Sequence, residues 1–162
     1  MWGINFKMGK MAYEHTATRR VEFSDTDMAG IMHYSNFFRF METAEHGFYR
    51  ELGFSVVMTG TDPRLGWPRV HAHCDYRKPL RFEDEVEIQL LVKEKRSKTI
   101  AYVFRFWKRT DRGKEEVARG GLTVVCVAHL VDGGMSAVRI PEEVSRLIEE
   151  APSELADPKG WG

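Results

Sequence analysis

The sequence has little of what marks membrane, disulfide-stabilised or nucleic-acid-binding proteins. None of its apolar runs reaches the roughly 18 residues that a bilayer-spanning helix needs, so no membrane partner is expected. Its two cysteines, Cys74 and Cys126, lack the paired spacing of a redox or zinc motif, and reduced thiols are expected. The 24 basic residues balance 24 acidic ones, and this zero net charge predicts no nucleic-acid partner.

Cofactor and metal signatures are also missing. The sequence has no Walker A loop, no dinucleotide fingerprint and no G-x-S-x-G elbow. His71 and His73 fall on one face of a predicted strand, but no further ligand stands at a suitable spacing, so no metal is expected and they are interpreted as interface or pocket residues. No signal-peptide core is seen near the first residue, and a cytoplasmic location is predicted.

What is present is typical of one globular domain. The chain has 162 residues, 43% of them hydrophobic and 30% charged, which suffices for one full core but not for two. We expect an irregular N-terminal extension over 1–15, a domain over 16–150 and a polar C-terminal tail over 151–162.

Hydrophobic periodicity predicts an α+β fold. A strand is expected over Thr16–Ser24, and a long amphipathic helix over Tyr34–Leu52, which Gly53 ends. The rest is rich in predicted strands and turns, with one short helix near the end. The expected elements are strands over Arg69–Arg77, Val86–Val92, Thr99–Lys108, Glu115–Val131 and Val138–Ile140 and a helix over Glu142–Glu150. This order implies an antiparallel sheet packed on the long helix, with its edge covered by a second copy of the chain.

The loop between the first strand and the helix carries the candidate chemistry. Asp27 lies a few residues before the helix, where unpaired backbone N–H groups carry a partial positive charge. Such groups, near His33 to Asn36, would polarise a thioester or ester carbonyl, while Asp27 acts on water as a general base or attacks as a nucleophile. Gly30 is expected to permit close backbone approach. The alternative is that Asp27 only bonds its own loop backbone, as aspartates often do.

Three further positions are candidates for substrate contacts. Arg96 and Lys98 lie in the densest basic cluster, which suits coenzyme A phosphates or is an ordinary solvated turn. Glu42 lines a pocket or pairs with His46 at i+4. His33 touches substrate or packs in the loop.

The loop motif resembles a known signature. Val21-Glu-Phe-Ser-Asp-Thr-Asp27-x-Ala-Gly30-Ile-x-x-Tyr34-x-Asn36 is similar to that of the 4-hydroxybenzoyl-CoA thioesterase-like family, and the similarity covers roughly 16–148. This resemblance implies a hotdog fold, in which a five- or six-stranded antiparallel sheet wraps a long central helix. It also implies dimers or tetramers with active sites built across subunit interfaces, and neither metal nor redox cofactor, since coenzyme A is part of the substrate.

Carried over by position, the resemblance assigns roles to individual residues. Asp27 matches the catalytic carboxylate, the Tyr34 N–H the group that polarises the carbonyl, and Arg96 and Lys98 the coenzyme A contacts. Gly30, His33, Asn36 and Glu42 are the candidate substrate-binding positions. The prediction is an acyl-CoA thioesterase; the alternatives are a non-catalytic acyl-CoA-binding module and a hotdog hydratase or dehydratase.

Overall fold

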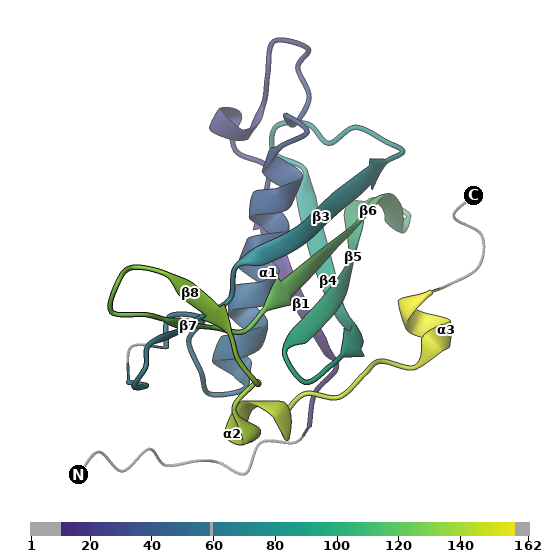
Figure 1. Ribbon diagram of the computed structural model, residues 1–162. Coiled ribbons are helices and arrows are strands. Elements are labelled where there is room, and N and C mark those ends of the chain that lie inside the picture. The colour runs from purple at the N-terminus through teal and green to yellow at the C-terminus, as the bar shows by residue number, and fades with distance from the viewer. Residues whose placement is uncertain (1–10, 59, 158–162) are drawn as a thin grey trace.

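A five-stranded antiparallel sheet lies against one long helix in the computed structural model, which describes residues 11–58 and 60–157 (Figure 1). In chain order the elements are β1 (Glu14–Arg20), the 3₁₀ helix η1 (Phe23–Asp25), α1 (Asn36–Glu51), β2 (Leu65–Gly66), β3 (Arg69–Tyr76), β4 (Glu85–Lys95), β5 (Thr99–Thr110), β6 (Gly113–Val125), β7 (Val127–His129), β8 (Met135–Ala137), α2 (Glu142–Ser145) and α3 (Ser153–Ala156). The strand order is β1-β4-β5-β6-β3, and β2, β7 and β8 form a smaller sheet. The α+β class with five main strands is confirmed.

The helix α1 forms because its apolar side chains recur on one face. That face packs on the sheet with Phe37, Phe40, Met41, Ala44 and Phe48 buried. The helix starts at Asn36, two residues later than predicted, because its first turn is tightened by a bond from the Phe37 N–H to the Tyr34 carbonyl. Gly53, at φ 88°, ends it as expected.

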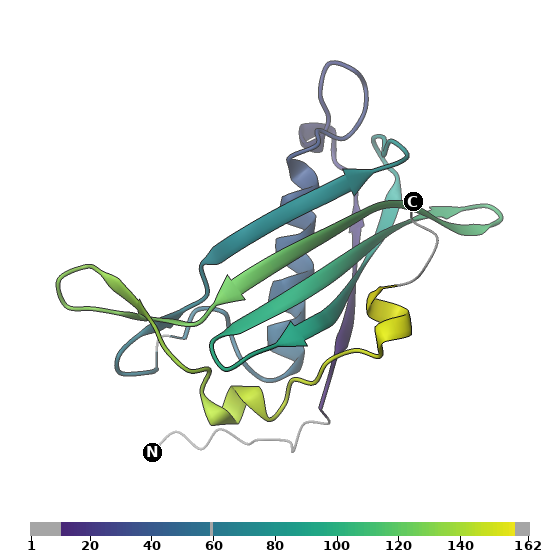
Figure 2. The same cartoon turned by 45° about the vertical axis from the view of Figure 1, so that its right-hand side comes forward.

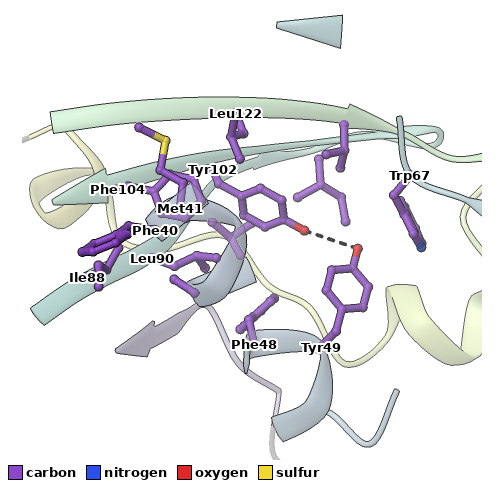
Figure 3. Close-up of a cluster of buried hydrophobic side chains, with 14 of the residues drawn as sticks. Phe40, Met41, Phe48, Tyr49, Trp67, Ile88, Leu90, Tyr102, Phe104 and Leu122 are labelled. Atoms are coloured by element: carbon purple, nitrogen blue, oxygen red, sulfur yellow. Dashed lines mark hydrogen bonds between the residues drawn. The ribbon is translucent and has the colours of Figure 1, made fainter. Parts of the chain in front are cut away.

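The core lies between α1 and the facing side of β4, β5 and β6. Large side chains from both layers interdigitate, as Figure 3 shows, with Tyr49 of α1 next to Tyr102 of β5. The Tyr102 hydroxyl donates to that of Tyr49 at 3.3 Å, so two buried polar groups are paired. On β6, a Cβ at Gly120 would collide with the end of the Met41 side chain, so Met41 packs directly on the backbone of β6.

The sheet has two edges, β1 and β3. One side of β3 pairs with β6, while its side chains are mostly exposed, Val70 at 63%. An open edge of this kind is a template for pairing with another strand. In both views the loop before α1 projects past the helix N-terminus, and the β4–β5 hairpin lies toward the opposite end (Figure 2).

Several predicted boundaries were wrong. The strand predicted to reach Ser24 ends at Arg20, because the Asp25 carboxylate caps the Glu22 N–H and folds the chain into η1, leaving Phe23 77% exposed. The strand predicted over Glu115–Val131 is two, β6 and β7, because the Cys126 N–H bonds the Lys98 carbonyl instead. The last strand is Met135–Ala137, earlier than predicted.

The two ends of the described chain also differ from expectation. The helix predicted over Glu142–Glu150 stops at Ser145, because the backbone at Leu147 and Glu149 bonds to Ala12 instead. β1 begins at Glu14, within the predicted extension. Within the predicted tail, Ala156 of α3 and Ala151, just before this helix, pack onto Leu91. The predictions for 1–10 and 158–162 lie outside the described residues, and the domain boundaries stay a prediction. No described helix is long and apolar enough to cross a bilayer.

Candidate active site

The loop before α1 is a closed turn that begins at Asp27. The Asp27 N–H donates to the Ile31 carbonyl and the Gly30 N–H to the Asp27 carbonyl, each at 3.0 Å. Gly30 has φ 76°, which L side chains rarely adopt, and nothing lies within 4 Å of where its Cβ would stand. Gly30 therefore serves the left-handed turn, and the close backbone approach expected there stays a prediction.

The Asp27 carboxylate is held from one side only. Its Oδ1 accepts the Ala29 N–H at 2.8 Å, and no described residue bonds Oδ2. The side chain is half-buried and lines a hollow of about 430 Å³. One oxygen is thus fixed, and the residue borders a space that a small molecule can enter.

The walls of this hollow are mainly apolar. They come from the loop, the start of α1 and the segment after β3: Asp27, Ile31, Met32, Tyr34, Phe37, Tyr76, Arg77, Lys78, Pro79 and Leu80. The ring of Tyr76 meets that of Phe37 edge-on, with centroids 4.9 Å apart. Such walls suit an apolar or aromatic group better than a charged one.

The N-terminal end of α1 supplies positive potential beside Asp27. The first turn contains no acidic residue that would neutralise it, and the Tyr34 N–H has no acceptor among the described residues. The Tyr34 carbonyl accepts the Tyr76 hydroxyl at 3.1 Å, which ties the helix start to the end of β3. Desolvation of its hydroxyl and the neighbouring Cys74 raise the pKa of Tyr76.

The other predicted loop residues fasten the turn. The Asn36 side-chain amide and the His33 N–H both donate to the Asp25 carbonyl at 2.8 Å. The His33 Nδ1 lies 2.8 Å from the Ser35 hydroxyl, and its ring packs on Tyr34. His33 and Asn36 do not line the hollow, and their substrate contacts stay a prediction.

Glu42 lies elsewhere, in a charged cluster between α1 and β3. Its Oε1 is 3.6 Å from His46 and 3.9 Å from Arg69. Arg69 also bonds the buried Glu45 carboxylate at 2.5 Å. Burial raises the pKa of Glu45 to about 7 although Arg69 opposes the shift. One chain alone does not bring this cluster to Asp27.

Arg96 and Lys98 lie at the opposite end of the sheet from Asp27. The Asp27 loop meets the start of β4, where Val21 and Asp84 are hydrogen-bonded, while Arg96 follows its last residue. The 11 residues of β4 span roughly 36 Å at about 3.3 Å each. Arg96 pairs with Glu94, and Lys98 donates to the Ala137 carbonyl at 3.2 Å. A single chain therefore does not unite the two halves of the predicted site.

Comparison with known proteins now identifies the family. A family profile described as the Thioesterase-like superfamily matches residues 21–148. The chain belongs to this superfamily. A putative esterase of Aquifex aeolicus (strain VF5) is 31% identical over 132 residues, 82% of this chain and 95% of that protein. A 1,4-dihydroxy-2-naphthoyl-CoA hydrolase of Synechococcus sp. (strain CC9902) is 31% identical over 81% of this chain and 87% of that protein.

Solved structures agree with this membership. A gentisyl-coenzyme A thioesterase shares 32% identity with a TM-score of 0.69, covering 80% of this chain and 98% of that one. A 4-hydroxybenzoyl-CoA thioesterase mutant complexed with 4-hydroxybenzoyl-CoA superposes with a TM-score of 0.77 at 23% identity, over 84% of this chain and 99% of that one, which shows the shared fold. The expectations of this family, of the hotdog fold and of a thioester-hydrolysing enzyme are confirmed.

Three residues of the thioesterase's site were missed from sequence. Tyr76 and Leu80 line the hollow, and Arg81 donates to the Gly30 carbonyl at 3.2 Å. They lie at the end of β3 or just after it, about 50 residues from Asp27 in the chain, a separation that no local pattern spans. The one available signal was the Lys78-Pro79 break, which ends β3 beside the loop.

Proposed function

We propose that this thioesterase hydrolyses a coenzyme A thioester to a carboxylic acid and free coenzyme A, with Asp27 as the catalytic carboxylate. The observation that carries the proposal is the placement of the Asp27 carboxylate. One of its oxygens is fixed by the Ala29 N–H, and the other is without a described partner beside the apolar hollow and the N-terminal end of α1.

The reaction divides between the carboxylate and the helix. The thioester carbonyl accepts the Tyr34 N–H, so the negative charge that develops on its oxygen meets the positive end of α1. Asp27 either takes a proton from the attacking water or attacks the carbonyl to give an anhydride that water opens. One such donor contributes roughly 3–4 kcal/mol, and general-base assistance about 10²–10⁴-fold in rate.

A second copy completes the site. The basic hairpin stands at the Arg69 end of β3, since Thr99 and Arg69 pair with neighbouring residues of β6, whereas Tyr76 at the other end contacts the Asp27 loop. Antiparallel pairing of β3 with its copy, about a two-fold axis, reverses these ends. Arg96 and Lys98 of one copy then approach the Asp27 hollow of the other, where they would bind coenzyme A phosphates.

The same reversal brings the acidic cluster of one copy toward the hollow of the other. Glu42 and Arg69 lie where β3 begins, and this end faces Tyr76 of the second copy. Glu42 would then line the substrate pocket from the second chain. This arrangement explains why neither Glu42 nor the basic hairpin lies near Asp27 within one chain.

We infer an aromatic acyl group with hydroxyl substituents as the preferred substrate class. Two relatives above 30% identity are named for gentisyl-CoA and 1,4-dihydroxy-2-naphthoyl-CoA, both hydroxylated aromatic acyl groups. The rings of Phe37 and Tyr76 in the hollow offer edges and faces on which an aromatic acyl group would pack.

The test is thiol release from a panel of hydroxyaroyl-, short-chain and medium-chain acyl-CoAs by the parent and by Asp27→Asn. We expect at least a hundredfold lower kcat in the variant with unchanged unfolding. Asp132→Asn is the matched control, because the Asp132 carboxylate also accepts the N–H two residues on, at Gly134, but lies in another turn. Release by Asp27→Asn at the parent rate would refute the assignment. Tight binding without release by the parent would favour the acyl-CoA-binding module instead.

A further inference from the structure

The outer face of the sheet, opposite α1, carries two histidines side by side at the open edge. His71 and His73 are exposed on β3, with ring centroids 5.2 Å apart. A Cβ at Gly121 would collide with the His73 ring, so this imidazole lies directly over the backbone of β6. Neither ring has a hydrogen-bond partner among the described residues. Both line an open hollow of about 650 Å³ on this face.

The spacing of the two rings suits a shared metal ion. Two imidazoles that bind one tetrahedral zinc at about 2.0 Å have ring centres roughly 5 Å apart. Nearby cations do not compete, because Lys93 pairs with Asp157 and Arg119 with Glu116. Within the described part of one chain, however, no group of three or more His, Cys, Asp or Glu residues could hold a metal ion. The chain alone provides half a site.

Pairing of β3 with its copy supplies the missing half. Because a two-fold axis perpendicular to the sheet keeps both outer faces on the same side, only residues of the same face can stand opposite one another. The centre of β3, Arg69–Tyr76, falls between Ala72 and His73. Two registers therefore pair the strands over nearly their whole length: in one the two-fold axis passes beside Ala72, and in the other beside His73.

Both registers bring the histidines of the two copies together. Centred on Ala72, His71 faces His73 of the second copy, and four imidazoles surround the axis. Centred on His73, this residue faces its own copy, and His71 faces Asp75 of the second copy. Side chains directly opposite on an antiparallel pair have Cβ atoms about 5 Å apart, within reach of one metal ion.

We propose that His71 and His73 of two copies form a site for a transition-metal ion such as Zn²⁺ across the β3–β3 seam. The site lies on the face away from α1 and serves assembly, whereas Asp27 performs the chemistry. Imidazole nitrogens are common ligands of such ions, with bond lengths of about 2.0–2.1 Å for zinc. The inference rests on the edge pairing proposed above, but not on the reaction.

The test is zinc titration of the metal-free full chain, with sedimentation to follow association. We expect one zinc per two chains and a dimer that withstands greater dilution with zinc than with a chelator. His71→Ala and His73→Ala should each weaken zinc binding at least tenfold. His129→Ala is the matched control, since its ring also lies over a glycine, Gly66, but has no neighbouring histidine on β7. Its zinc binding should equal the parent's.

The possible failures are distinct. A dimer that binds no zinc, or binding that survives His73→Ala, would overturn the metal site and leave the edge pairing intact. One zinc per chain without effect on association would overturn the shared site. A chain that stays monomeric with and without zinc would refute the pairing itself. The comparison of thiol release by the parent and by Asp27→Asn, measured separately, tests the reaction and does not depend on zinc.

Discussion

Glu45 is the one acidic side chain among the described residues that is fully buried, and its ionisation should lower stability. Its Oε2 bonds Arg69, but its Oε1 has no partner, so the charged form is poorly compensated. Burial, opposed by Arg69 and reinforced by Glu42, raises the pKa from 4.5 to about 7 in the folded state. The unfolded chain keeps the lower value.

The sign and size of the effect follow from these two values. The folded state holds the Glu45 proton more tightly, so this group's contribution to stability is complete below pH 4.5 and is lost as the pH rises through 7. At about 1.4 kcal/mol per pKa unit, the loss is roughly 3 kcal/mol, or a third of a typical domain's stability.

Glu45→Gln removes this pH dependence, because the amide does not ionise. The measurement is urea unfolding, followed by tryptophan fluorescence, at pH 5, 6, 7 and 8. The free energy of unfolding of the variant, relative to that of the parent, should rise by roughly 2–3 kcal/mol from pH 5 to pH 8. Glu143→Gln is the matched control, because it makes the same replacement at an exposed position on α2. If the difference in free energy of unfolding between Glu45→Gln and the parent does not change with pH, the reasoning is refuted.

Three further predictions concern the site and the core. Tyr76→Phe loses the hydrogen bond to the Tyr34 carbonyl, about 1 kcal/mol, and should lower kcat about fivefold; an unchanged kcat would mean that this bond does not position the helix start. Gly120→Ala places a Cβ against Met41 and should lower the free energy of unfolding by about 1–3 kcal/mol, measured in urea; a neutral effect would show that Met41 repacks freely. Arg96→Ala should raise KM severalfold for a CoA thioester but not for the pantetheine thioester of the same acid, which has no nucleotide phosphates; equal effects on both would remove Arg96 from phosphate binding.

Local patterns were enough to predict the elements that carry their own periodicity. The apolar stripe of α1 and the alternation over residues 86–90 of β4 each identify a buried face without tertiary information. The motif around Asp27 likewise lies in one continuous loop, so its turn and its position before the helix were predictable.

Features set by distant partners were not predictable. The helix α2 ends early because Leu147 and Glu149 bond Ala12, more than 130 residues away in the sequence. Tyr76 joins the candidate site because its hydroxyl bonds the carbonyl of Tyr34. A tyrosine at the end of a strand does not by itself indicate such a contact. The pairing of Glu45 with Arg69 required knowing that β3 starts beside the middle of α1.

The strand order also determines when the protein can become active during synthesis. The β4–β5 and β5–β6 hairpins join neighbouring segments, but β1 must wait for β4, about 70 residues later, and β3 must wait for β6. Because pairing of segments distant in the sequence costs more loop-closure entropy, both edge strands should dock last. A ribosome-bound chain has made Asp27 long before residue 125 is available to complete the frame. We therefore expect no thioester hydrolysis by nascent chains until most of the protein has emerged.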